Sequence, residues 1–436
     1  MTTGFFWLAA TTGLLSLLTP CVFPMVPVTI AYFSTPVGRR SASFRRPLLF
    51  GLGIIATFTL LGLVLASLFG AAGLNRFAAD PTVNLVLAAL FVIFAANLFG
   101  WIATPVPWRV ANAADRAARG TTPGSSLGAL VMGATFTLTS VTCTAPFVGT
   151  LLVLAAKGSW AMPVLGMLVY STFFALPFVL LALVPGALSR LPRAGEWMQT
   201  IRVLIGLIEI GAAVKFLSNA DLVRGWGVVT RNVVLVTWAA LALVGAVYLG
   251  RSMLAKQQRR QASLGALVPI AATLVLAVWL LSGLNGRVLP QIEAFLPPAI
   301  HHTPRAGDSL SPTWMLNDYP RAQALAKSSG KAVFIDFTGY TCTNCRWMEA
   351  NIFSRPDVGA ALGNFVLSRL YTDGDGEIYQ RQQEFQEKSF GTVALPLYAV
   401  VGPDGKTRAT FSGLTRNPAE FIAFLERAET GGRSGA

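Results

Sequence analysis

Charged residues are scarce in this chain, and their scarcity decides its class. Only 12% of the 436 residues are charged, 53% are hydrophobic, and the mean hydropathy is +0.58. This balance excludes an ordinary soluble protein and predicts a polytopic membrane protein in a lipid bilayer. Residues 1–304 contain 6 acidic and 20 basic residues, whereas residues 305–436 contain 14 of each. The net charge of +14 therefore indicates membrane orientation and not nucleic-acid binding.

Cysteine and histidine are also rare. The four cysteines are too few for a disulfide scaffold, but each lies in a motif. The two histidines, His301 and His302, are adjacent in a segment rich in proline, with no cysteine or carboxylate cluster nearby. We interpret the histidines as part of a linker and not as a metal site.

A cysteine and three prolines interrupt the first long apolar run, residues 5–33. The stretch Thr19–Pro27 reads TPCVFPMVP. Proline breaks the helical hydrogen-bond ladder, and in lipid the freed carbonyl groups need other helices or water. The stretch predicts a broken transmembrane helix that lines a cavity, with Cys21 near the break. The alternative is that Cys21 is a small buried residue without a chemical role.

The same Cys-x-x-Pro pattern recurs in a later apolar run, residues 126–155. There Cys143 and Pro146 repeat the arrangement of Cys21 and Pro24. A motif that recurs in two halves is typical of internally duplicated membrane folds, whose working sites lie near the middle of the membrane. Two cysteines placed in this way suggest a redox pair.

The apolar runs predict eight membrane spans and an orientation. The spans cover roughly residues 5–33, 48–70, 83–101, 126–155, 160–185, 202–220, 229–250 and 264–284. One set of connecting loops carries 14 Lys and Arg and the other only 5. The positive-inside rule puts the richer set in the cytoplasm and both termini outside. Cys21 and Cys143 then lie on oppositely directed helices, which predicts an inverted repeat. The first span begins near Met1 without a basic segment, so we expect a retained helix and not a signal peptide.

Two ionisable residues, Glu209 and Lys215, fall in the sixth span. A charge at that depth is costly and is a functional candidate. Glu209 has either a redox-related role or a structural polar contact, and Lys215 can extend its amine toward the membrane surface.

The remaining chain predicts a tether, a small α/β domain and a short tail. Residues 285–312 are rich in proline and indicate an extended linker, and residues 431–436 indicate a disordered tail. Residues 313–430 alternate between amphipathic and apolar segments. We expect helices near 319–328, 342 onward, 377–387 and 418–428, with strands near 332–337, 364–371, 397–401 and 407–412.

A second pair of cysteines, Cys342 and Cys345, lies between a strand and the helix that follows it. A zinc site usually needs a second ligand pair, which the tail lacks. A helix N-terminus stabilises a thiolate, so the position favours a redox dithiol in which Cys342 attacks. Asp336, acidic within an apolar strand, is either a paired core residue or a proton acceptor for the second cysteine. Pro396 precedes a strand beside the expected dithiol, and we expect a cis bond there.

Together these motifs resemble the DsbD family of transmembrane thiol:disulfide interchange proteins and, for residues 1–284, the smaller CcdA proteins. In this resemblance Cys21 and Cys143 match the membrane cysteine pair, and residues 313–430 match the C-terminal thioredoxin-like domain. Cys342 matches the attacking cysteine and Cys345 the resolving one. Asp336 and Glu349 match two acids near the motif, and Pro396 matches the cis-proline. The resemblance implies redox-active disulfides without a cofactor.

The resemblance also implies a direction and partners. Electrons would pass from cytoplasmic thioredoxin through the membrane pair to the dithiol outside a bacterial inner membrane, with both termini periplasmic. Family members usually carry an immunoglobulin-like N-terminal domain that this sequence does not show, so we expect a separate periplasmic thiol–disulfide protein as acceptor. Two alternatives stay open: a reductant dedicated to cytochrome c maturation, and a small-solute transporter with a redox-sensing domain.

Overall fold

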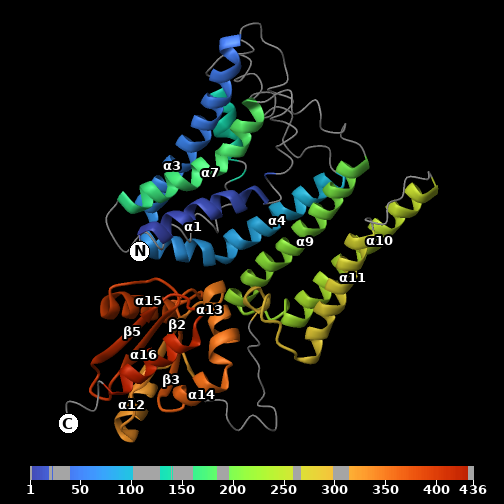
Figure 1. Cartoon of the computed structure of the whole chain (residues 1–436). Coiled ribbons are helices and arrows are strands. Elements are labelled where there is room, and N and C mark those ends of the chain that lie inside the picture. The colour runs from blue at the N-terminus through green and yellow to red at the C-terminus, as the bar shows by residue number, and fades with distance from the viewer. Residues whose placement is uncertain are drawn as a thin grey trace. The chain divides into compact units, whose positions relative to one another are not determined.

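The computed structural model describes residues 2–18, 22, 40–101, 128–138, 140, 161–183, 196–258, 267–297 and 314–430 (Figure 1). Cys21 and Cys143 lie outside the described residues. The chain divides into two compact units, which are described separately below. One contains residues 1–74, 89–212 and 251–260, and the other contains residues 75–88, 213–250 and 261–436.

Apolar helices make up most of the described residues between 2 and 282. They are α1 (Thr2–Leu15), α3 (Arg40–Ala79), α4 (Pro81–Leu98), α7 (Ala161–Leu183), α9 (Glu196–Arg224), α10 (Arg231–Gln258) and α11 (Leu267–Ser282). Within the described ranges, four stretches are long and apolar enough to cross a bilayer: Arg45–Val64, Pro81–Leu98, Arg231–Leu254 and Leu267–Asn285. Shorter apolar helices cover Phe5–Leu15, Gly128–Leu138 and Val164–Leu180. The expected helical membrane domain is confirmed, while the count of eight spans and the inverted repeat stay predictions.

Helices α1 and α7 pack closely in the first unit. A side chain at Gly13 would place its Cβ 2.5 Å from the backbone oxygen of Tyr170, so the close approach requires glycine. The hydroxyl of Tyr170 donates a hydrogen bond to the Ser16 hydroxyl at 2.8 Å. Aromatic side chains of α3, α7 and the helix at 128–138 fill the core: Phe50, Phe58, Phe136, Tyr170, Phe174 and Phe178.

A folded segment follows α11 in the second unit. It contains two short 3-10 helices, η3 (Gly283–Asn285) and η4 (Glu293–Phe295). The Arg231 guanidinium at the start of α10 pairs with Glu293, Nε to Oε1, at 2.7 Å and donates to the Gly283 carbonyl at 2.8 Å. Leu289 and Leu296 are buried in the same cluster. The first part of the expected extended linker, residues 285–297, is therefore packed. The proline content suggested an extended chain, but the Arg231–Glu293 ion pair and the burial of Leu289 and Leu296 hold this segment in a folded conformation.

The tail contains a five-stranded mixed sheet. The strands are β1 (Met315–Leu316), β2 (Val333–Thr338), β3 (Val366–Tyr371), β4 (Leu397–Val401) and β5 (Thr407–Ser412), in the order β1-β3-β2-β4-β5. β1, β3 and β2 run parallel, and β4 and β5 are antiparallel to their neighbours. The helices around the sheet are α12 (Tyr319–Ser329), α13 (Thr343–Met348), the π-helix η5 (Glu349–Phe353), α14 (Pro356–Leu362), α15 (Glu377–Phe390) and α16 (Pro418–Thr430) (Figure 1).

The two faces of the sheet have separate cores because successive side chains of a strand point to opposite faces. Val333, Ile335 and Phe337 of β2 pack with α12 and α15. Phe334 packs on the other face with α13, η5, α14 and α16. Asp336 shares the alternation of Phe334, so it lies on the face that carries α13. The α/β domain expected at 313–430 is thus confirmed in its helices and strands, while its chain boundaries stay a prediction.

Candidate active site

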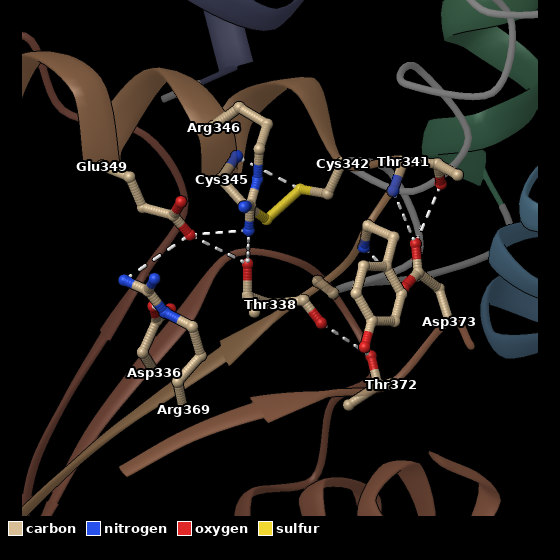
Figure 2. Close-up of a disulfide and its surroundings, with 12 residues drawn as sticks. Asp336, Thr338, Thr341, Cys342, Cys345, Arg346, Glu349, Arg369, Thr372 and Asp373 are labelled. Carbon is tan, nitrogen blue, oxygen red and sulfur yellow. Dashed lines mark hydrogen bonds and ion pairs between the residues drawn. A yellow bond between two sulfur atoms is a disulfide. The ribbon is translucent and has the colours of Figure 1, made fainter. Parts of the chain in front are cut away.

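A disulfide joins Cys342 and Cys345 at the start of α13 (Figure 2). Cys342 is the N-cap residue, and its sulfur accepts a hydrogen bond from the Cys345 N–H at 3.2 Å. Cys342 is half-buried, whereas Cys345 is only 1% exposed. An attacking thiol must reach a partner and a resolving thiol need not, so this burial agrees with the order expected from sequence.

The loop that leads into Cys342 is fixed by Asp373. The carboxylate accepts hydrogen bonds from the Tyr340 N–H at 2.7 Å, from the Thr341 N–H at 2.9 Å and from the Thr341 hydroxyl at 2.9 Å. Burial raises the pKa of Asp373, and its bonds to Thr341 and Tyr340 oppose that rise. The Tyr340 ring also stacks on Tyr371 with centroids 4.0 Å apart. These contacts hold the segment before Cys342 in one conformation.

Asp336 forms an ion pair with Arg369. The two residues are register partners on β2 and β3, and Arg369 Nε lies 2.8 Å from Asp336 Oδ2. Asp336 is 1% exposed and the Arg369 side chain 14%. Burial raises the pKa of Asp336, and the neighbouring Arg369 guanidinium lowers it. Asp336 is therefore paired, as expected for a paired core residue, which was one of the two alternatives from sequence. Its role as a proton acceptor stays a proposal.

Glu349 completes a cluster of two acids and two arginines. Its Oε1 lies 2.6 Å from Arg346 Nη2 and 3.6 Å from Arg369 Nη2. Arg346 also donates to the Thr338 hydroxyl at 2.9 Å. Figure 2 shows the cluster between α13 and the strands. The four charges balance, which offsets part of the cost of burying them.

The remaining sequence candidates have different outcomes. The Leu395–Pro396 peptide bond is cis, as expected. Glu209 on α9 is 1% exposed, and neither of its carboxylate oxygens has a hydrogen-bond partner within the described part of the chain. Lys215 lies on the same helix and is half-buried. Cys21 and Cys143 lie outside the described residues, so their pairing stays a prediction. Among the residues that the structure describes, no group of three or more His, Cys, Asp or Glu could hold a metal ion.

Three site residues were missed from the sequence: Arg346, Arg369 and Asp373. Arg369 is the only charged residue of β3, just as Asp336 is the only charged residue of β2. Single charges of opposite sign in two buried strands were therefore a usable signal for an ion pair. Arg346 follows Cys345 directly, but its burial depends on packing that sequence does not display. Asp373 lies in a polar loop, where an acid usually faces solvent.

Comparisons with known proteins identify two families in this chain. A family described as the cytochrome c biogenesis protein transmembrane domain matches residues 2–220, half of the chain, and a thioredoxin-like family matches residues 314–403. The chain is 30% identical over 358 residues to the thiol:disulfide interchange protein DsbD of Vibrio vulnificus, covering 80% of this chain and 56% of that protein. It is 30% identical over 412 residues to DsbD 1 of Pseudomonas aeruginosa, covering 92% and 66%.

A solved thioredoxin from Thermus thermophilus is 26% identical, covers 29% of this chain and 94% of its own, and gives a TM-score of 0.25. The chain spans 56% to 66% of the length of the two DsbD relatives above. The transmembrane match lies before the thioredoxin-like match in the chain. The Cys342–Cys345 disulfide falls within the thioredoxin-like match. The chain therefore belongs to the DsbD family, with the transmembrane domain followed by a thioredoxin-like domain.

Proposed function

We propose that this membrane protein is a thiol–disulfide reductase that carries electrons out of the cytoplasm. Cytoplasmic thioredoxin would reduce Cys21 and Cys143 in the membrane. That pair would reduce the Cys342–Cys345 disulfide outside a bacterial inner membrane, and the dithiol would reduce a separate soluble disulfide protein. Exchange between sulfur atoms needs no added cofactor.

The observation that carries this proposal is the Cys342–Cys345 disulfide at the start of α13 in a thioredoxin-like domain. Once reduced, Cys342 has a helix N-terminus and the Cys345 N–H to stabilise its thiolate. The thiolate attacks a client disulfide, which forms a mixed disulfide and releases one client thiolate. Cys345 then attacks the Cys342 sulfur, which restores the internal disulfide and releases the second client thiolate.

We propose that the buried Asp336 accepts the proton of the Cys345 thiol in that second step. Cys345 is almost fully buried, so solvent has poor access to its proton. Asp336 lies on the sheet face that carries α13, and its pairing with Arg369 favours the carboxylate form.

The membrane half of the pathway is supported by the family match over residues 2–220 and by one packing feature. Val22, the neighbour of Cys21 in the chain, belongs to the same buried cluster as Phe136, which precedes Cys143 by seven residues. The 14-to-5 asymmetry of Lys and Arg between the loops supports the orientation. Of the alternatives, the disulfide-bearing domain favours a reductase over a solute transporter.

The direct test is the redox state of Cys342 and Cys345 in cells. Outside the cytoplasm no glutathione pool keeps a dithiol reduced, so the dithiol depends on another source of electrons. We expect Cys342 and Cys345 to be largely reduced in the wild type and oxidised in Cys21→Ala. A dithiol that stays reduced in Cys21→Ala would refute the membrane route.

Clients can be identified with a trapping pair of variants. Cys345→Ser should accumulate mixed disulfides through Cys342, because the resolving thiol is missing, and Cys342→Ser should accumulate none. The trapped proteins would show whether the client range is general or confined to cytochrome c maturation. If both variants trap the same proteins, Cys342 is not the attacking residue.

A further inference from the structure

We propose that Tyr170 is a positioning residue for the membrane cysteine Cys21: through a hydrogen bond to Ser16, it holds the end of the helix from which the Cys21 segment begins. The inference rests on the proposed function, because it concerns the Cys21–Cys143 pair of that route. Cys21 itself lies outside the described residues, but Ser16 and Val22 on either side of it are described.

The segment that carries Cys21 cannot be held by one uninterrupted helix. Pro20 and Pro24 flank the cysteine, and proline has no N–H group to donate to a helical ladder. Helix α1 ends at Leu15 and is followed by one turn of 3-10 helix, η1 (Ser16–Leu18). The position of Cys21 therefore depends on what holds the chain before and after it.

Before the cysteine, the chain is tied to α7 by two consecutive hydrogen bonds. The Tyr170 hydroxyl donates to Ser16 Oγ at 2.8 Å, and the Ser16 hydroxyl donates to the Thr12 carbonyl at 2.8 Å. Tyr170 and Ser16 are both 0% exposed. A serine oxygen that donates one bond keeps lone pairs to accept another, so the two bonds are compatible. Because hydrogen bonds are directional, they fix the height and the rotation of the α1 end against α7.

The Tyr170 side chain is itself held by its neighbours. Its ring stacks on Phe174 with centroids 6.3 Å apart and an interplanar angle of 9°, and the Phe58 ring meets it edge-on at 5.7 Å. Its backbone oxygen is the atom against which Gly13 packs. The aromatic core of the first unit therefore directs the Tyr170 hydroxyl at Ser16.

The contact between α1 and α7 extends along much of α1 (Figure 1). At its other end Gly166 of α7 faces Phe5, where an added Cβ would lie 2.7 Å from the ring. Small residues at such contacts let membrane helices approach closely. Phe5 and Ser16 are 11 residues apart in the sequence, about 16 Å along a helix. Contacts at both ends make α7 a firm support for α1.

The residue after the cysteine is also fixed. Val22 is 1% exposed and belongs to the buried cluster that contains Tyr170. Neighbouring Cα atoms are about 3.8 Å apart, so Cys21 has a fixed point on this side. From Ser16 the chain reaches Cys21 in five residues, at most about 18 Å when fully extended. Loss of the Tyr170 bond would release one of these two ends, and the Cys21 sulfur would then sample a larger volume.

The expected consequence is a lower effective concentration of the Cys21 thiol toward Cys143. A disulfide within one chain forms only when its two sulfur atoms meet, so well-fixed cysteines favour it. Apolar packing alone could hold α1 on α7, because replacing both partners of a buried hydrogen bond by apolar groups can be nearly neutral for stability. What the bond between Tyr170 and Ser16 adds is position.

The effective concentration can be measured on the full chain in detergent. Cys342→Ser and Cys345→Ser remove the other two thiols. The chain is equilibrated with mixtures of glutathione and glutathione disulfide, quenched with acid and alkylated to separate dithiol from disulfide. Oxidation of the membrane pair passes two electrons and two protons to glutathione disulfide, which leaves as two glutathione thiols. The equilibrium constant has units of concentration and equals the effective concentration of one membrane thiol toward the other.

We expect Tyr170→Phe to lower the effective concentration about 3- to 10-fold, the range of one hydrogen bond between neutral groups. For a two-electron couple, a tenfold change raises the reduction potential by about 30 mV. Ser16→Ala should give the same change, and the double variant should fall no further, because both substitutions remove one bond. Tyr248→Phe is the matched control: it removes a hydroxyl from another apolar helix, α10, and should leave the value unchanged.

Thermal unfolding of the same variants separates positioning from stability. If Tyr170→Phe unfolds at a lower temperature but keeps the wild-type effective concentration, the bond only stabilises the helix pair and the proposal is overturned. Additive losses in the double variant overturn it as well. If Tyr170→Phe does not fold, Ser16→Ala is measured with the same criteria. Its control is Ser171→Ala, because that buried serine donates to the Met167 carbonyl of its own helix at 2.7 Å.

The wild-type measurement distinguishes this inference from the proposed function. If Cys21 and Cys143 form no disulfide at any glutathione ratio, the proposed membrane route and this inference both fail. If the wild type forms the disulfide and Tyr170→Phe forms it equally well, this inference alone fails. The assay uses no cellular thioredoxin and no client, so its result does not depend on the direction of electron flow.

Discussion

Arg346 and Glu349 form an ion pair, but removal of Glu349 should cost more folding stability than removal of Arg346. Arg346 is 5% exposed and Glu349 17%, and their atoms lie 2.6 Å apart. Removal of one partner of a buried pair costs about 3–5 kcal/mol, because the other charge is left without compensation. We expect that full cost for Glu349→Gln and a smaller one for Arg346→Met.

Two features of the structure lower the cost of Arg346→Met. Glu349 keeps a second guanidinium, since Arg369 Nη2 lies 3.6 Å from its Oε1. The Nε and Nη1 groups of Arg346 are buried without a hydrogen-bond partner in the described residues. A buried donor without an acceptor costs about 1–3 kcal/mol, and methionine removes that cost while filling similar space. The net loss of stability for Arg346→Met should then be about 1–2 kcal/mol.

The stability of the thioredoxin-like domain can be measured in the full chain by pulse proteolysis across a urea series, which reports the fraction unfolded at each concentration. Both variants should lower the midpoint, and Glu349→Gln should lower it at least twice as far. Arg355→Met removes an exposed arginine and serves as the control, with an unchanged midpoint expected. An equal or larger fall for Arg346→Met would show that its unpaired donors carry no cost and would refute the reasoning.

Three further predictions concern the membrane pair, pH and the loop before the dithiol. Cys21 and Cys143 should protect each other from alkylation until the chain is reduced. Burial raises the pKa of Asp336 above its unfolded value, so the folded domain binds this proton more tightly. Its contribution to stability is full below the unfolded pKa and is lost as pH rises through the folded pKa. Stability relative to Asp336→Asn should fall over that range. Gly339→Ala should slow the reaction of Cys342 with thiol reagents, because the new Cβ would lie 2.6 Å from Asp373 Oδ2.

Each of these measurements has a contrary outcome. Independent alkylation of the two membrane cysteines would refute electron transfer through a Cys21–Cys143 disulfide. A pH dependence that is the same in wild type and Asp336→Asn would mean that Asp336 titrates alike in the folded and unfolded chain. Gly359→Ala is the control for Gly339→Ala, because its Cβ meets nothing within 4 Å. If both variants react at the wild-type rate, the Asp373 bonds do not position Cys342.

Much of the fold was predictable because it depends on local pattern. The strand at Val333–Thr338 and the hairpin of β4 and β5 follow from apolar runs bounded by turn residues. The redox site at Cys342 followed from its place between a strand and a helix. Sequence missed α14, a short helix over Pro356–Leu362. It also missed β1, which is two residues long and pairs only through the register of β3.

The counter-ions of the site were harder to predict because they depend on pairing between distant segments. Asp336 and Arg369 are 33 residues apart, and only the parallel register of β2 and β3 places them together. The packing of residues 285–297 was not predicted from the sequence for a similar reason. Its ion pair joins residues 62 positions apart, so proline content alone suggested an extended linker.

Trp314, the first residue of the domain that the structure describes, has a consequence for how such proteins can be recombined. Its ring lies against Arg369, so the point where the tether enters the domain also touches the charges behind the dithiol. A gene fusion that joined a new partner one residue later would keep every strand and both cysteines. We expect that chimaera to fold and still exchange disulfides more slowly at neutral pH. A fusion protein that is to keep the wild-type rate of exchange should therefore retain Trp314.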